Sequence, residues 1–166
     1  MLNIGFIACG GIARHHASRL AGLRNARIVA CSDASLDAAK SFAAEYGTED
    51  AAVYTDYGRM LKLDHIDAVW VCTPTYLHAA PVLAAAKAGK HIFCEKPLAG
   101  NAKDGARMVK AAKDTGLVLQ IGLQSRFNPH SWTLRKRIEQ GLLGEVYYGR
   151  TMALRRRGIP GAPTFV

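Results

Sequence analysis

The first fifteen residues hold the feature that most restricts how this chain can fold. An apolar segment from Leu2 to Ile7 has the character of a buried strand, and it runs into a glycine-containing turn and then a helix. Such a turn brings unpaired backbone N–H groups and the positive end of a helix dipole to one place. That arrangement suits a phosphate or pyrophosphate group, although an ordinary strand-to-helix turn would show the same pattern.

The turn has the spacing of a dinucleotide-binding fingerprint, G-x-G-x-x-G/A, with Ala8, Gly10 and Ala13 at its three small positions. Gly10 allows the backbone to approach phosphate closely, and Ala13 is small enough for the contact between helix and strand. Ala8 replaces a glycine, so we expect a negative φ there, because alanine pays a steric cost in left-handed conformations. Together with Gly11 and Ile12, these residues are predicted to bind the cofactor.

A second apolar segment, residues 26–31, ends shortly before Asp33. A carboxylate at that strand end can accept hydrogen bonds from both hydroxyls of an adenosine ribose. The alternative is that Asp33 caps the helix expected to start near Ala34, since aspartate is a favoured N-cap, and both roles can hold at once. Residues 34–37 contain no arginine or lysine to meet a 2′-phosphate, so we favour NAD over NADP as the cofactor.

Strands and helices alternate along the first three quarters of the chain. Strands are expected over 2–7, 26–31, 52–54, 66–72, 91–94 and 118–121, and helices over 12–21, 34–46, 57–63, 76–88 and 102–115. This alternation predicts an α/β fold with a doubly wound parallel sheet.

The regular alternation of strands and helices ends after residue 121. A helix is expected over 129–143, a strand over 145–154 and a loop over 155–163. A single strand cannot bury its own faces, so we expect residues 1–121 to form the cofactor domain and residues 122–166 to begin a second, incomplete domain.

Composition excludes several classes of protein. Hydrophobic residues make up 49% and charged residues 21% of the 166 positions, which is typical of a globular protein rather than a disordered one. No apolar run approaches the roughly 18 residues of a membrane span, and no leader segment precedes the first strand, so we expect a cytoplasmic protein without a membrane partner. The net charge of +9 could suggest nucleic acid, but the cations are dispersed without interleaved aromatics, so we expect no nucleic-acid partner.

The four cysteines each fall near the end of an expected strand, and no two of them form a C-x-x-C pair. They are Cys9, Cys31, Cys72 and Cys94. We expect them to be reduced and buried, and we predict no metal site.

Polar residues follow two neighbouring strands at the sheet edge where open α/β folds bind ligands. Thr73 and Pro74 follow one strand, and Glu95 and Lys96 follow the next. A lysine beside a nicotinamide can assist proton transfer from a substrate hydroxyl while hydride leaves the same carbon. The alternative is a surface lysine paired with Glu95. Pro97 favours the first interpretation, because a residue before proline is kept out of helical geometry.

His78 is interpreted differently from His15 and His16. His78 is expected in the first turn of a helix, where the dipole disfavours a cation, so we expect a neutral hydrogen-bonding role near the cofactor. A histidine satisfied within the helix interface is the alternative. His15 and His16 are expected on the surface of the first helix.

Five motifs, taken in order, resemble the glucose-fructose oxidoreductase, inositol dehydrogenase and rhizopine catabolism family (Gfo/Idh/MocA). They are Ala8-Cys9-Gly10-Gly11-Ile12-Ala13, Thr73-Pro74 with His78, Glu95-Lys96-Pro97, Arg126-Phe127-Asn128-Pro129 and Gly141-Leu142-Leu143-Gly144-Glu145. The resemblance implies a Rossmann domain, a C-terminal α/β substrate domain, and NAD(P)-dependent oxidation or reduction at a secondary alcohol of a sugar or cyclitol. It makes Lys96 catalytic, places Thr73, Pro74, His78 and Glu95 near the cofactor, and places Lys96 and Arg126 near the substrate.

The sequence also departs from that family. Ala8 replaces the first glycine, and Thr75 stands where many relatives carry asparagine. Relatives continue into a large sheet that carries an aspartate and a histidine acting with the lysine, and through which they often associate, whereas this sequence ends at Val166. The resemblance therefore implies an incomplete active site in this chain, little activity on its own, and a homo-oligomer for a full-length parent. A non-catalytic, NAD-binding regulatory module is the alternative.

Overall fold

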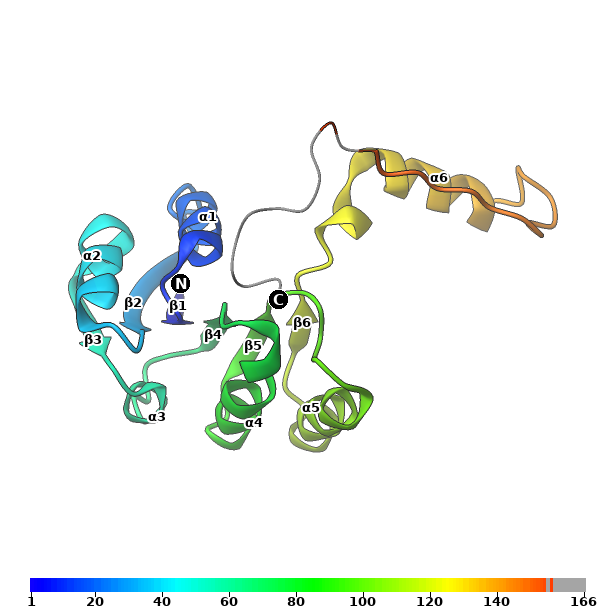
Figure 1. Cartoon of the computed structure of the whole chain (residues 1–166). Coiled ribbons are helices and arrows are strands. Elements are labelled where there is room, and N and C mark those ends of the chain that lie inside the picture. The colour runs from blue at the N-terminus through cyan, green and yellow to red at the C-terminus, as the bar shows by residue number, and fades with distance from the viewer. Residues whose placement is uncertain (155, 157–166) are drawn as a thin grey trace. The chain divides into compact units, whose positions relative to one another are not determined.

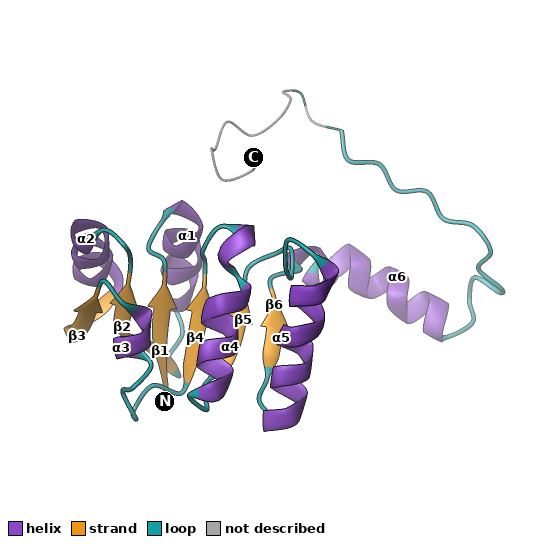
Figure 2. Ribbon diagram, turned by 60° about the horizontal axis from the view of Figure 1, so that its bottom comes forward, coloured by secondary structure: helices purple, strands orange, loops and turns teal. Residues whose placement is uncertain are grey.

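The computed structural model describes residues 1–154 and 156, and the chain divides into two units that meet between Gly122 and Leu123. The first unit is built on a parallel sheet with the strand order β3-β2-β1-β4-β5-β6 (Figure 2). This is the order of a doubly wound dinucleotide-binding sheet, so the expected fold class is confirmed. The strands are β1 (Leu2–Ile7), β2 (Ala26–Ser32), β3 (Gly47–Tyr54), β4 (Ala68–Val71), β5 (His91–Cys94) and β6 (Leu119–Ile121).

Helices cover both faces of the sheet (Figure 1). On one face lie α1 (Gly11–Leu20) and α2 (Leu36–Tyr46), and on the other lie α3 (Tyr57–Met60), α4 (Ala79–Lys87) and α5 (Ala102–Thr115). A short 3-10 turn, η1 (Thr75–Leu77), precedes α4. Each face has its own buried core, one around Phe6 and Phe42 and the other around Val69, Val82 and Met108. Two apolar layers against one sheet are what near-continuous apolar strands predict.

Local signals account for most helix boundaries. The Asp56 side chain accepts a hydrogen bond from the N–H of Gly58 at the start of α3, and the Asn101 side chain accepts one from Asp104 at the start of α5. Helix α5 ends at Gly116, which has a left-handed φ of 67° that glycine adopts without a Cβ penalty. These capping contacts fix where the helices start and stop.

The second unit departs from the sequence prediction. It contains η2 (Gln124–Phe127) and α6 (Pro129–Glu139), and α6 ends four residues before the expected boundary in a turn with a positive φ at Gly141. The strand expected over 145–154 is wrong, since none of those residues is in a strand. A strand forms only with a hydrogen-bonded neighbour, and the described residues provide none for this segment. Of the loop expected over 155–163, all but Arg156 lies outside the described residues.

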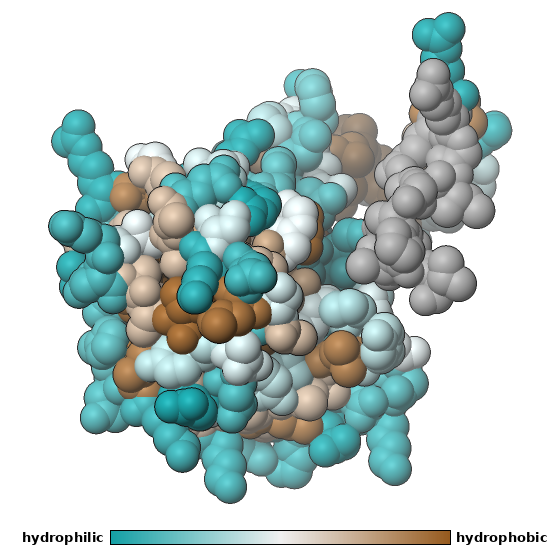
Figure 3. Space-filling model, turned by 60° about the vertical axis from the view of Figure 1, so that its left-hand side comes forward, coloured by the Kyte–Doolittle hydropathy of each residue, from teal (hydrophilic) through white to brown (hydrophobic). Residues whose placement is uncertain are grey.

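On the face shown in Figure 3, the largest group of apolar side chains lies near the centre of the view, and smaller apolar groups are scattered among hydrophilic side chains. Among the described residues, no helix combines the length and apolar character needed to cross a bilayer.

Candidate functional site

The turn between β1 and α1 forms an open cradle of backbone N–H groups. Gly10 is the N-cap of α1, no side chain in the described part of the chain caps the helix, and the first turn carries no acidic residue. The first N–H groups of a helix have no intrahelical acceptor, so those of Gly11, Ile12 and Ala13 need an external partner. A Cβ built on Gly10 or Gly11 meets no atom of the described residues within 4 Å. The cradle therefore has both the donors and the space for a pyrophosphate.

Ala8 has a φ of +70°, so the expectation of a negative φ at this position is wrong. The cause lies in two successive hydrogen bonds to the end of β2. The Ala8 N–H donates to the Ser32 carbonyl at 2.8 Å, and the Cys9 N–H donates to the Asp33 carboxylate at 2.8 Å. Successive N–H groups of an extended strand point to opposite sides, so both reach β2 only if the backbone turns sharply at Ala8. The alanine accepts the left-handed conformation at a steric cost.

Asp33 joins the cradle to the end of β2. Its Oδ2 accepts the Cys9 N–H, and its Oδ1 accepts the Ser35 N–H at 2.9 Å. It does not cap α2, because the N-cap is Ser35, whose hydroxyl accepts from the N–H of Ala38. The half-buried carboxylate keeps further lone pairs on both oxygens, so it can also accept hydrogen bonds from ribose hydroxyls.

Glu95 lies at the end of β5 and is 8% exposed. Its Oε1 lies 2.6 Å from Nε2 of His16, and its Oε2 accepts the Lys96 N–H at 2.9 Å. His16 comes from α1, and its side chain is only 23% exposed, so the prediction of a surface histidine is wrong here. It follows the buried Ala13 by three positions and precedes the buried Ala17 by one, a spacing that could have indicated an inward-facing residue.

His78 is buried, at 1% exposure, and lies at the N-cap of α4 rather than in its first turn. Its Nδ1 lies 2.9 Å from the Pro97 carbonyl oxygen, and its Nε2 lies 2.9 Å from the Thr73 carbonyl oxygen. A neutral imidazole donates from one nitrogen only, so each tautomer of His78 can donate to one of these two carbonyls. The ring joins the segments that follow β4 and β5. This arrangement corresponds to the alternative interpretation, in which the histidine makes its hydrogen bonds inside the fold.

Thr73 follows β4 at the same edge of the sheet. Its hydroxyl oxygen is buried and makes no hydrogen bond to any described residue. Pro74, half-buried, starts the turn η1. A buried hydroxyl without a partner is costly, so this atom indicates a place where a ligand can supply the missing hydrogen bond.

Lys96 and Pro97 are exposed beyond the end of β5, and the peptide bond between them is cis. Lys96 therefore lies at the same strand-end edge as Thr73 and Glu95, where the sequence predicted it. Arg126 belongs to the second unit, where it is exposed in η2. Its expected contact with substrate stays a prediction.

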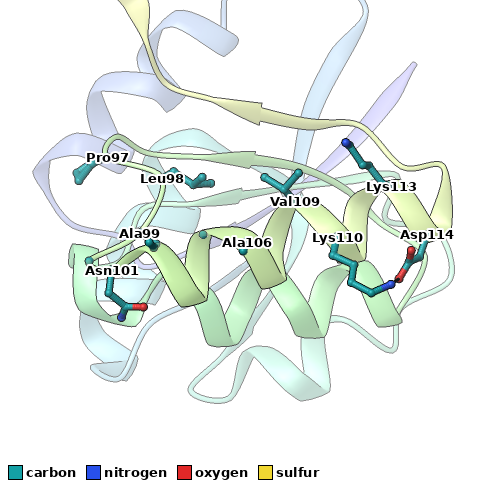
Figure 4. A pocket seen from close by; sticks show the side chains of 12 residues that line it. Pro97, Leu98, Ala99, Asn101, Ala106, Val109, Lys110, Lys113 and Asp114 are labelled. Carbon is teal, nitrogen blue, oxygen red and sulfur yellow. Dashed lines mark hydrogen bonds and ion pairs between the residues drawn. The ribbon is translucent and has the colours of Figure 1, made fainter.

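A hollow of about 820 Å³ starts at Pro97 and runs along the outer side of α5 (Figure 4). It is lined by Leu98, Ala106 and Val109 and ends near Lys110 and Asp114, which form an ion pair at 2.7 Å. Small and apolar side chains dominate the wall. The hollow is separate from the candidate cofactor site, because the cradle, Asp33 and Glu95 are not among its lining residues.

The four cysteines are free and buried, as expected. Burial, with the nearby Glu95 charge, raises the pKa of the Cys94 thiol to about 12, and the same two causes raise the pKa of Cys72. Because the thiolate is the reactive form of cysteine, these two are structural residues rather than nucleophiles.

Comparison with known proteins identifies relatives of this arrangement. Residues 2–123 match the Gfo/Idh/MocA family profile, described as an oxidoreductase family with an NAD-binding Rossmann fold. Inositol 2-dehydrogenase of Rhizobium meliloti (strain 1021) is 38% identical over 145 residues, which is 87% of this chain and 43% of that protein. D-glucoside 3-dehydrogenase of Escherichia coli (strain K12) is 35% identical over 165 residues, which is 99% of this chain and 46% of that protein.

Solved structures agree. Scyllo-inositol dehydrogenase from Lactobacillus casei, with bound NAD(H) and scyllo-inositol, gives a TM-score of 0.80 at 25% identity and covers 87% of this chain and 43% of that one. A 3-ketoreductase from Actinomadura kijaniata, in complex with NADP, gives 0.76 at 28% identity and covers 87% and 46%. The two structures hold different dinucleotides. This chain spans less than half the length of each of these four relatives.

Proposed function

Because this chain belongs to the Gfo/Idh/MocA oxidoreductase family, we propose that it is the NAD-binding portion of a dehydrogenase acting on a secondary alcohol of a sugar or cyclitol. One observation carries the proposal: the uncapped N-terminus of α1 opens onto free space at Gly10 and is tied through Cys9 to the carboxylate of Asp33. Donors for a pyrophosphate and an acceptor for a ribose are thus held next to each other at the ends of β1 and β2.

In this proposal, the N–H groups of Gly11, Ile12 and Ala13 bind the pyrophosphate, and Asp33 binds the adenosine ribose. At the same edge of the sheet, Thr73 offers a hydroxyl that has no hydrogen-bond partner among the described residues. Asp33 also supports NAD over NADP, because its carboxylate would repel a 2′-phosphate and residues 34–37 supply no cation to offset the repulsion.

Lys96 is proposed as the proton-transfer group. The bound nicotinamide supplies a hydride acceptor or donor. The exposed Lys96 side chain beyond β5 can take the substrate hydroxyl proton as a neutral amine in the oxidation and return it as an ammonium in the reduction, while Glu95 holds the Lys96 main chain in place. Arg126, which belongs to the second unit, is proposed to contact the substrate.

Replacement of Gly10 by alanine tests cofactor binding. The φ of Gly10 is −73°, and an added Cβ meets no protein atom, so Gly10→Ala should fold as stably as the wild type. The methyl would occupy the space over the cradle, and we expect the NAD dissociation constant, measured by calorimetry, to rise by about tenfold or more. Gly22→Ala, where the nearest atom is 3.7 Å away, is the matched control and should leave NAD binding unchanged.

If the wild-type chain does not bind NAD, or if Gly10→Ala binds it equally well, the proposal is wrong. Lys96→Ala separates binding from chemistry. It should leave the NAD affinity of this chain within about twofold, and it should abolish most turnover of a longer protein that carries this segment. Unchanged turnover would remove Lys96 from its role.

A further inference from the structure

We propose that His16 is a positioning residue: it acts through Glu95 to hold the main chain of Lys96. The inference rests on the proposed function, because it concerns the same lysine. It deepens that function by assigning a role to a residue on the cofactor-binding helix, far from Lys96 in the sequence.

The contacts form a short chain of hydrogen bonds. Nε2 of His16 lies 2.6 Å from one oxygen of Glu95, and the other oxygen of Glu95 accepts the Lys96 N–H at 2.9 Å. Both oxygens of one buried carboxylate are therefore occupied, one from α1 and one from the segment after β5. A hydrogen bond to an ionised carboxylate is stronger than a neutral one, so this bridge resists displacement of Lys96.

The space around Glu95 leaves its carboxylate little freedom to move. A Cβ built on Gly122 would lie 3.1 Å from Oε1 of Glu95 and 3.1 Å from the ring of Phe93. That tight approach means that the backbone at Gly122 forms a wall of the Glu95 pocket. If the His16 hydrogen bond is lost, one buried oxygen of Glu95 has no partner. The carboxylate can then gain one only by rotating, and rotation weakens its hydrogen bond to the Lys96 N–H.

The ring of His16 is itself held by a row of aromatic side chains. It contacts Phe93 edge-on at 5.0 Å between ring centres, Phe93 stacks on Trp70 at 5.1 Å, and Trp70 stacks on Phe6 at 6.0 Å. Phe6, Trp70 and Phe93 are register partners across β1, β4 and β5. This packing fixes the orientation of the imidazole ring, as is needed for a residue that positions another.

The electrostatics of the cluster agree with the geometry. Burial alone would raise the pKa of Glu95, but the hydrogen bonds from His16 and from the Lys96 N–H outweigh it and hold the pKa below its ordinary value. Glu95 is thus kept as a carboxylate, the form that accepts from both partners.

The test uses backbone amide NMR of the 166-residue chain, with the Lys96 N–H as the reporter. In His16→Ala, we expect the Lys96 amide resonance to move and its hydrogen exchange to become about tenfold faster or more, because the Glu95 oxygen that it contacts reorients. His16→Gln retains an N–H donor and should largely restore the wild-type behaviour. His15→Ala, on the exposed neighbour, is the matched control and should change nothing.

His16→Phe separates the loss of the hydrogen bond from the loss of ring packing. It preserves an aromatic ring against Phe93 but removes the donor, so it should reproduce the effect of alanine. The inference is overturned if the Lys96 amide is unchanged in folded His16→Ala or His16→Phe. It is also overturned if His16→Gln changes the Lys96 amide as much as His16→Ala does.

NAD titrated into the same samples separates this inference from the proposed function. Failure of the wild type to bind NAD would defeat the proposed function while leaving the Lys96 response intact. Normal NAD binding with an unresponsive Lys96 amide would defeat the positioning role alone.

Discussion

The main-chain N–H of Cys9 donates to the Asp33 carboxylate at 2.8 Å, which ties the turn after β1 to the tip of β2. This hydrogen bond joins the proposed pyrophosphate cradle directly to the proposed ribose acceptor. A carboxylate that supports the turn and is also proposed to accept hydrogen bonds from the ribose should affect NAD binding more than an ordinary surface acid.

The first prediction concerns Asp33. Asp33→Asn keeps an oxygen for the turn but removes the charge, so we expect NAD to bind about tenfold more weakly, while NADP loses less or gains. Calorimetric titration of both dinucleotides measures the ratio. Asp37→Asn, an exposed acid in the first turn of α2, is the control and should leave the ratio unchanged. An unaltered preference in Asp33→Asn would mean that Asp33 does not select the cofactor.

Much of the fold could be predicted because its signals are local. Glycines and prolines mark the ends of elements, and residues 102–115 and 91–94 form the expected helix and strand without any shift. The strand over 145–154 failed because strand formation needs a partner that no local pattern reveals. The cradle and Asp33 were found from a short motif, but the contact between His16 and Glu95 spans 79 positions and was missed.

The second prediction concerns the left-handed turn. Ala8→Gly removes the steric cost of a φ of +70° but adds freedom to the unfolded chain, so we expect a net gain of about 0.5 to 1 kcal/mol in the free energy of unfolding. Urea denaturation measures it. Ala106→Gly, on the exposed side of α5, should instead lose about 0.5 to 1 kcal/mol, since glycine is unfavourable within helices. A loss of stability in Ala8→Gly would contradict the strain at this position.

The third prediction concerns acid stability. Burial raises the pKa of Glu95, but hydrogen bonds from His16 and Lys96 leave it below the ordinary value of 4.5. A group with a depressed folded pKa stabilises the fold above its unfolded pKa, and that contribution is lost as the pH falls through the folded value. We therefore expect the unfolding free energy of Glu95→Gln to fall less steeply below pH 4.5 than that of the wild type.

Denaturant titrations at a series of pH values measure that slope. Glu49→Gln, at an exposed position of β3, is the control and should keep the wild-type slope. Identical slopes for Glu95→Gln and the wild type would show that Glu95 titrates as it does in the unfolded chain.

The last prediction concerns the hydroxyl of Thr73, which is buried and makes no hydrogen bond within the described part of the chain. Thr73→Val keeps the shape of the side chain and removes a polar atom that costs free energy when it is unsatisfied. The variant should therefore be as stable as the wild type or up to about 1 kcal/mol more stable, yet it should bind NAD several-fold more weakly. Thermal melts with and without NAD measure both effects. Equal NAD affinity would leave the buried hydroxyl without a ligand and would remove Thr73 from the cofactor site.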